Sequence, residues 1–120
     1  MIVRLTREFT FEAAHHLPRA PEGHKCRRLH GHSFRVEVTV EGPVDPETGW
    51  FLDYGVIRGQ VEPIRARLDH YCLNEIEGLE NPTSEHLARW IWERLKPSLP
   101  SLARIVVAET CESRCEYEGR

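Results

Sequence analysis

Two segments of the chain alternate between apolar and polar residues. In residues 2–14 most apolar side chains fall on one parity and the polar ones on the other, and residues 32–41 alternate without a break. A period of two places every second side chain on the same face, as in a strand with one buried face. Both segments are therefore predicted to be half-buried strands, with apolar faces formed by Val3, Leu5, Phe9, Phe11 and Ala13, and by Phe34, Val36, Val38 and Val40.

Two later segments have helical spacing. The first follows Asp53, a residue suited to cap a helix, and its apolar positions recur up to Leu68. Pro63 lies inside this segment and is expected to kink the helix. The second has Thr83 or Ser84 as its cap and runs to Leu95, before Pro97. Their predicted buried positions are Ile57, Val61, Ile64 and Leu68, and Leu87, Ala88, Ile91, Trp92 and Leu95.

The last part of the chain predicts two more strands. Residues 103–109 form an apolar run that fits a buried strand, and residues 113–118 form a shorter extended segment. A further extended piece, residues 50–52, precedes the first helix. The order β-β-α-α-β-β indicates an α+β fold: one domain over residues 1–120, with a four-stranded antiparallel sheet and two helices on one face. So small a sheet has exposed edges, which makes oligomerisation plausible.

Composition narrows the function classes. The chain has 16 Lys and Arg against 19 Asp and Glu, a formal charge of −3. Nucleic-acid-binding domains usually have a basic surplus, so we expect no nucleic-acid partner. No apolar run approaches the length of a membrane span, and residues 1–8 do not resemble a secretory signal, so we expect no membrane partner and a cytoplasmic location. Four cysteines in such a chain suggest free thiols instead of a disulfide framework.

Histidine is concentrated in one part of the sequence. Five of the seven histidines lie within residues 15–32. If residues 2–14 and 32–41 pair as a hairpin, His15 lies close to His30 and His32, and the last two project to the same face. Three imidazoles in that arrangement can hold a zinc ion with one open position, although solvent-exposed loop histidines fit the spacing equally well. His16 and His24 are expected not to be ligands.

Four other residues are candidates for chemistry. Cys26, among basic neighbours, fits either a fourth metal ligand or a catalytic nucleophile or base. Asp69 and His70 follow the first helix, where a solvated helix end is the simpler interpretation. Glu109 closes a buried run; a carboxylate there often faces a cleft, although a solvent-exposed strand end is the default.

Five short motifs occur in order along the chain: Phe-Glu-Ala-Ala-His at 11–15, Cys-Arg-Arg-Leu-His-Gly-His at 26–32, Leu-Asp-His at 68–70, Asn-Pro-Thr-Ser-Glu at 81–85 and Glu-Thr at 109–110. Taken together, they resemble the 6-pyruvoyl-tetrahydropterin synthase family over essentially the whole chain. Three residues separate Cys26 from His30, which is most similar to the bacterial branch, the 6-carboxy-5,6,7,8-tetrahydropterin synthases of queuosine biosynthesis.

The resemblance implies a tunnelling fold, in which three four-stranded sheets close a barrel and two such trimers stack into a hexamer with active sites at subunit interfaces. It implies zinc at His15, His30 and His32. Cys26 would be the base, with Asp69 and His70 as a proton relay.

The same resemblance implies a substrate. The enzyme would convert 7,8-dihydroneopterin triphosphate to 6-carboxy-5,6,7,8-tetrahydropterin, releasing acetaldehyde and triphosphate. Glu109 would be coupled to the relay and would anchor the pterin ring, with Thr83 and Ser84 also contacting it. Lys25, Arg27 and Arg28 could attract the triphosphate, or could be solvated loop charges. Two alternatives stay open: formation of 6-pyruvoyl-tetrahydropterin, and a non-catalytic zinc-stabilised binding module.

Overall fold

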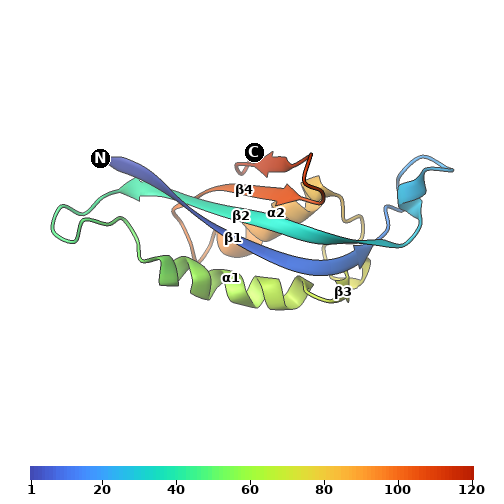
Figure 1. Cartoon of the computed structure of the whole chain (residues 1–120), viewed down its shortest axis with the longest axis horizontal. Helices are drawn as coiled ribbons and strands as arrows, with labels where there is room; N and C mark the ends of the chain where they lie inside the picture. The colour runs from blue at the N-terminus through green and yellow to red at the C-terminus, as the bar shows by residue number, and fades with distance from the viewer.

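A computed structural model describes the whole chain, residues 1–120. The molecule is elongated, with principal extents of 58 × 24 × 23 Å (Figure 1). Its elements, in chain order, are β1 (Ile2–His15), a short 3-10 helix η1 (Lys25–Arg27), β2 (His30–Pro43), α1 (Tyr54–Leu68), β3 (Tyr71–Cys72), a second 3-10 helix η2 (Leu73–Glu75), α2 (Ser84–Leu95), β4 (Leu102–Ala108) and β5 (Cys115–Tyr117).

The sheet is built around the long β1–β2 pair. The two strands are antiparallel over their full length, from Ile2 opposite Pro43 to His15 opposite His30. β4 continues the sheet beside β2, and β5 pairs with β4, both antiparallel, which gives the order β3-β1-β2-β4-β5. The predicted α+β class is confirmed, and the two predicted strand pairs and two helices follow in the predicted order, with one further strand, β3, between the helices. β2 begins at His30, two residues before the predicted start, because its pairing with β1 continues to the end of that strand.

The sheet has a fifth strand that the expected four-stranded antiparallel sheet lacks. β3 runs parallel to β1 and pairs only with Ala13 and Ala14. The chain reaches this position after α1 through a turn at His70, whose φ is 64° and whose main-chain N–H donates to the carbonyl of Glu12 at 2.6 Å. A residue with positive φ reverses the chain direction locally, and histidine adopts this conformation more readily than β-branched residues do.

Each helix begins at a side-chain cap. The carboxylate of Asp53 accepts the N–H of Gly55 at 2.8 Å, and α1 continues through the exposed Pro63 without interruption. At α2 the hydroxyl of Thr83 accepts the N–H of His86 at 3.1 Å, so Thr83 is the cap and Ser84 is the first helical residue. The caps of both helices satisfy main-chain N–H groups that have no partner within the helix.

Residues 50–52, which precede α1, form a bend instead of the predicted extended segment.

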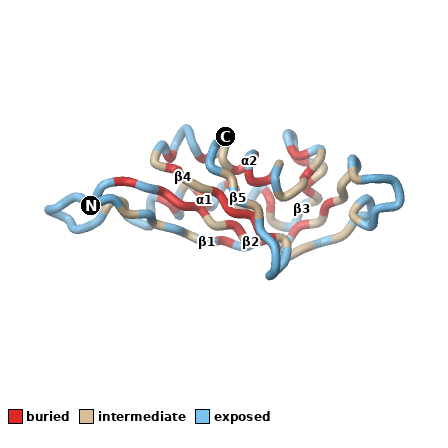
Figure 2. The backbone as a smooth tube through the Cα atoms, turned by 90° about the horizontal axis from the view of Figure 1, so that it is seen from above, coloured by how far each residue is buried: buried red, intermediate tan, exposed pale blue.

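One apolar core lies between the sheet and the two helices. The core holds Phe9, Phe11 and Ala13 of the predicted β1 face and the whole predicted β2 face, together with Ile57, Val61, Leu68, Leu87 and Ile91 of the helices. Leu5 and Trp92, predicted to be buried, are only partly buried against it, and Val3 lies outside it. α1 packs against β1, and α2 against β4 and β5. Buried positions therefore follow the middle of the molecule, whereas the long turns at both ends are exposed (Figure 2). No helix in the structure combines the length and apolar character that crossing a membrane requires.

Candidate metal and catalytic site

Three histidine side chains converge at the end of the β1–β2 pair. His15 is the last residue of β1, His30 the first of β2, and His32 follows two residues later on the same face. One ring nitrogen from each lies within 4.8 Å of the other two. The hairpin register brings these residues together, as the spacing predicted, and His16 and His24 lie outside the cluster.

His15 is the most constrained of the three. Its side chain is fully buried, and its Nδ1 lies 2.9 Å from the carbonyl oxygen of Pro82. A carbonyl can only accept, so Nδ1 carries the proton and Nε2 keeps a free lone pair. Burial lowers the pKa of His15, although the Pro82 contact and the nearby Glu109 act in the opposite direction. The neutral imidazole that a metal requires is therefore the favoured form.

His30 is oriented in the same way. Its Nδ1 lies 2.7 Å from the carbonyl oxygen of Arg28, which leaves Nε2 free. Histidines that bind metals usually donate their other N–H to a carbonyl or carboxylate. Two of the three imidazoles, those of His15 and His30, thus donate the nitrogen that faces away from the metal position to a main-chain carbonyl. Nothing in the sequence marks Pro82 or Arg28 as the residues that supply these carbonyls.

The cluster fits a metal ion. The Nε2 atoms of His15 and His32 are buried and have no hydrogen-bond partner. Buried polar nitrogens without a partner are costly, and a bound cation would satisfy both. The residues are therefore compatible with a metal cofactor, with His15, His30 and His32 supplying three imidazole nitrogens.

Glu109 lies beside this cluster, directly after β4. Its carboxylate oxygens are 4.0 Å from Nε2 of His15 and 3.7 Å from Nε2 of His32. The side chain is 28% exposed, so the carboxylate faces a cleft instead of bulk solvent. Of the two interpretations that the sequence left open for Glu109, a cleft-facing carboxylate and a solvent-exposed strand end, the structure favours the first. Its separation from Nε2 is too long for a hydrogen bond.

Cys26 shares a pocket with the histidines but does not belong to their cluster. The pocket is about 510 Å³ and is lined by Lys25, Cys26, Arg28, Leu29, His30, His32, Glu109 and Thr110. Cys26 is half-buried, and its main chain is held on both sides: its carbonyl accepts the N–H of Leu17 at 2.7 Å, and its N–H donates to His24 at 3.1 Å. The thiol is thus placed next to a possible metal without being one of its three grouped ligands.

Asp69 and His70 form a hydrogen-bonded pair elsewhere in the chain. Nδ1 of His70 lies 2.9 Å from the Asp69 carboxylate, which also accepts the main-chain N–H of Glu12 at 2.9 Å. That main-chain bond is the largest cause of a lowered pKa for Asp69, followed by the bond from His70. The carboxylate therefore stays ionised and orients the imidazole.

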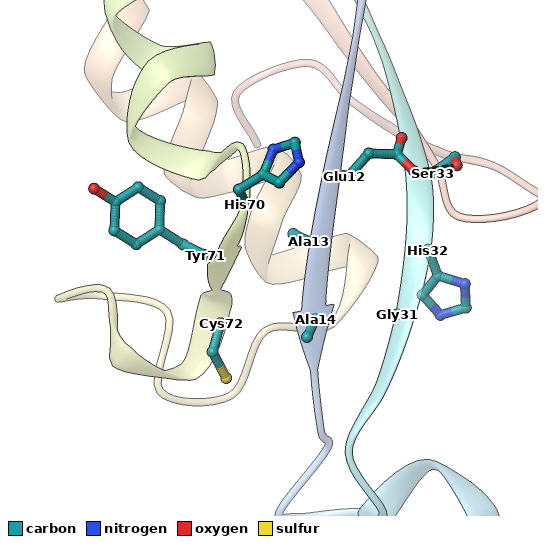
Figure 3. A pocket seen from close by; sticks show the side chains of 9 residues that line it. All are labelled: Glu12, Ala13, Ala14, Gly31, His32, Ser33, His70, Tyr71 and Cys72. Carbon is teal, nitrogen blue, oxygen red and sulfur yellow. Dashed lines mark hydrogen bonds between the residues drawn. The ribbon is translucent and has the colours of Figure 1, made fainter.

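The structure does not bring this pair to Cys26 within one chain. His70 lines a different pocket from Cys26, with Glu12, Ser33 and Cys72 among its walls, and His32 is the one residue that lines both pockets. Figure 3 shows the His70 pocket, with the imidazole of His70 beside β1 and that of His32 beside β2. The predicted catalytic residues thus fall into two groups, one around Cys26 and one around His70.

Ser84 joins the group around Glu109. The two residues line a common pocket of about 530 Å³, together with Thr110 and Arg114. Thr83 is next to it, but its hydroxyl is occupied in capping α2. Of the two hydroxyl residues predicted to contact a ligand, only Ser84 lines this pocket.

Comparison with known proteins decides the family. The sequence model described as 6-pyruvoyl tetrahydropterin synthase matches residues 4–120. The chain belongs to this family.

The chain is similar to several proteins that are named for different pterin-related activities. The 6-carboxy-5,6,7,8-tetrahydropterin synthase of Synechocystis sp. is 47% identical over 117 residues, 92% of this chain and 89% of that protein. The dihydroneopterin monophosphate aldolase of Pyrococcus furiosus is 36% identical, covering 98% and 99%. The structure of Caenorhabditis elegans 6-pyruvoyl tetrahydropterin synthase superposes with a TM-score of 0.91 at 27% identity, covering 100% and 97%. The predicted family, tunnelling fold and enzyme class are confirmed.

Proposed function

We propose that this chain is a zinc-dependent lyase that converts 7,8-dihydroneopterin triphosphate and water to 6-carboxy-5,6,7,8-tetrahydropterin, releasing acetaldehyde and triphosphate, in queuosine (7-deazaguanine) biosynthesis. The observation that carries the proposal is the pocket that holds His30, His32, Cys26 and Glu109, in a chain 47% identical to a protein named for this product. Four free thiols fit a reducing compartment, so the proposal includes a cytoplasmic location.

His15, His30 and His32 would hold the zinc. Three imidazole nitrogens are the ligand set that zinc accepts while keeping a fourth position open. When bound, zinc would polarise the hydroxyl oxygens of the substrate side chain and stabilise negative charge that develops on them. The buried Nε2 atoms that lack partners support this assignment.

Cys26 would be the base that removes a proton from carbon. Its backbone is fixed by two hydrogen bonds, so the thiol stays within the pocket that the substrate side chain would enter. A thiolate next to a substrate carbon whose neighbouring oxygen is polarised can take such a proton. Glu109 would accept hydrogen bonds from the amino-pyrimidinone edge of the pterin, with Ser84 and Thr83 nearby.

Asp69 and His70 would move protons on the other side of the substrate. Since Nδ1 of His70 donates to Asp69, Nε2 is available to exchange a proton with the substrate. In one chain the pair is remote from Cys26, so we propose that a neighbouring copy supplies it in a trimer or hexamer. β1 pairs with β3 at only two residues, so most of its outer edge has no strand partner within the chain and could pair with another copy.

The test is to incubate the purified protein with 7,8-dihydroneopterin triphosphate and to quantify acetaldehyde, pterin product and zinc in one sample. The proposal expects acetaldehyde and 6-carboxy-5,6,7,8-tetrahydropterin in equal amounts, with one zinc per chain. Triphosphate release without acetaldehyde would identify a 6-pyruvoyl-tetrahydropterin synthase. A two-carbon aldehyde that keeps its phosphate, formed from dihydroneopterin monophosphate, would identify an aldolase like the Pyrococcus relative.

A zinc-stabilised binding module is the non-catalytic alternative. It requires Cys26 to close the metal site, whereas the grouped ligand atoms are the three histidines alone. Cys26→Ala separates the two: the enzyme retains zinc and loses turnover, and the module loses both zinc and fold. Cys111→Ala, at an exposed thiol outside the Cys26 pocket, is the matched control and should behave as wild type.

A further inference from the structure

Two positive charges lie at the pocket of Cys26 without acidic partners. Lys25 and Arg28 flank Cys26 in the sequence, and both line the pocket that contains His30 and Glu109. Six ion pairs between arginines and carboxylates occur in the molecule, and neither Lys25 nor Arg28 takes part in any of them. Charges that have no partner beside a pocket are available to an anionic ligand.

Arg27, between them, is committed elsewhere. Its Nη1 donates to the carbonyl oxygen of Ala20 at 2.9 Å, and its side chain does not line the pocket. The structure therefore separates three consecutive basic positions that the sequence could not tell apart. Lys25 and Arg28 face the ligand space, and Arg27 holds the loop between β1 and β2 together.

A second basic pair near the site is less suitable for an anion. Arg35 and Arg114 line a small pocket of about 240 Å³ beside Thr110. Arg35 lies 3.8 Å from the carboxylate of Glu8, and Arg114 lies 4.0 Å from that of Glu37. An anion there would have to compete with carboxylates already in place, whereas at Lys25 and Arg28 it would not.

We propose that Lys25 and Arg28 form the subsite for the triphosphate of the substrate. The assignment of the substrate rests on the proposed function. A pterin anchored at Glu109 by its amino-pyrimidinone edge directs its side chain toward the opposite end, past the histidines. The phosphates at the end of that side chain then need cations beyond Cys26. An ammonium group and a guanidinium group suit phosphate oxygens, the guanidinium through paired hydrogen bonds.

Arg28 also connects the subsite to the metal site. Its carbonyl oxygen accepts the hydrogen bond from Nδ1 of His30 at 2.7 Å, and the same residue lines the pocket. The main chain that positions one metal ligand therefore also positions one phosphate-binding cation. A substitution of the side chain leaves the carbonyl, and hence the orientation of His30, unchanged.

The decisive experiment compares the double variant Lys25→Gln/Arg28→Gln with Arg27→Gln and with wild type. Inorganic tripolyphosphate is titrated into each zinc-loaded protein by calorimetry, after zinc content and circular dichroism show that the variants match. We expect the Kd to rise about 10- to 100-fold in the double variant, the effect of losing hydrogen bonds to charged groups, and to stay within about twofold in Arg27→Gln. Binding of tripolyphosphate through the metal persists in every variant, so it cannot produce this difference.

The second readout is the KM for 7,8-dihydroneopterin triphosphate, compared with the inhibition constant of dihydroneopterin, which lacks the triphosphate leaving group and can only compete for the site. The proposal expects the KM to rise only in the double variant, and the inhibition constant of dihydroneopterin to stay the same in all three proteins. Equal tripolyphosphate binding in all three proteins, or an equal loss in Arg27→Gln, overturns the subsite. Tripolyphosphate binding that depends on Lys25 and Arg28 without any pterin turnover leaves the subsite standing and refutes the proposed reaction. Acetaldehyde formation with an unchanged KM in the double variant supports the proposed reaction and refutes the subsite.

Discussion

The Nδ1 atom of His15 lies 2.9 Å from the carbonyl oxygen of Pro82, 67 positions away in the sequence. This hydrogen bond joins the end of β1 to the segment before α2. It also fixes the tautomer of His15, because the nitrogen that faces the carbonyl must carry the proton. One main-chain oxygen thus directs the lone pair of Nε2 toward His30 and His32, before any metal binds.

His15→Gln should remove the metal. The variant loses one of the three grouped imidazoles. Substitutions of residues that only hydrogen-bond to metal ligands typically reduce metal affinity 10- to 100-fold, so for the loss of a ligand we expect the zinc affinity to fall by at least about 100-fold. Zinc per chain, measured after gel filtration, checks this. His16→Gln is the control, because His16 lies outside the cluster, and it should retain wild-type zinc. Full zinc occupancy in His15→Gln would contradict the assignment.

Asp69→Asn should change the response of the fold to acid. The pKa of Asp69 is held below its ordinary value of 3.8, first by the N–H of Glu12 and then by His70. Its ionised form therefore stabilises the fold above that ordinary value, and this contribution disappears as the pH falls through the lower pKa of the folded protein. The urea midpoint of wild type should exceed that of Asp69→Asn at pH 5, and the two should converge toward pH 2.

The control for that measurement is Glu62→Gln, at an exposed carboxyl of α1 with no ion-pair partner. Its urea midpoint should follow wild type at both pH values. If Asp69→Asn matches wild type at pH 5, the carboxylate contributes no stability through Glu12 and His70.

Cys115 should react slowly with alkylating agents. Burial raises the pKa of its thiol above 9.0, and the carboxylates of Glu85 and Glu116 act in the same direction. Because the thiolate is the reactive form, iodoacetamide at pH 8 should modify the exposed Cys111 on the order of tenfold faster. Peptide mass spectrometry over time gives both rates. The rate at Cys115 should still be rising above pH 9, and comparable rates for the two thiols at pH 8 would refute the prediction.

Two glycine substitutions should have opposite effects. A Cβ at Gly42 would overlap the ring of Phe51, which packs against the core, so Gly42→Ala should destabilise by about 1–3 kcal/mol. Gly59 in α1 has open space around that position, so Gly59→Ala should stabilise by about 0.5–1 kcal/mol. Chemical denaturation gives both values. Stabilisation of both variants would show that the ring of Phe51 moves aside at little cost, and destabilisation of both would contradict the expected gain at Gly59.

The sequence predicts the histidine cluster because it depends on a local rule. Once residues 2–14 and 32–41 alternate, an antiparallel hairpin places His15 opposite His30, and a period of two places His32 on the same face. The apolar faces of both strands follow from the same periodicity. Capping residues and apolar positions at helical spacing likewise predict the two helices, although only the structure distinguishes Thr83 from Ser84 as the cap of α2.

What the sequence misses depends on contacts without a local pattern. β3 has two residues, too few to show any periodicity, and it exists because the turn at His70 returns the chain to β1. The carbonyl of Pro82 gives no signal, since every residue has one. The separation of His70 from Cys26 also needs three-dimensional information, because motif order does not say which pocket each residue lines.

The length of the β1–β2 pair has a practical consequence for handling the protein. The histidines lie at one end of this pair, and Met1 lies at the other, where its carbonyl accepts the N–H of Val44. Fourteen residues of strand span roughly 45 Å, so a surface anchor, dye or affinity handle attached at Met1 or at the turn around Glu47 would sit far from the pocket in the same chain. Immobilisation through that end should leave the pocket open to small molecules.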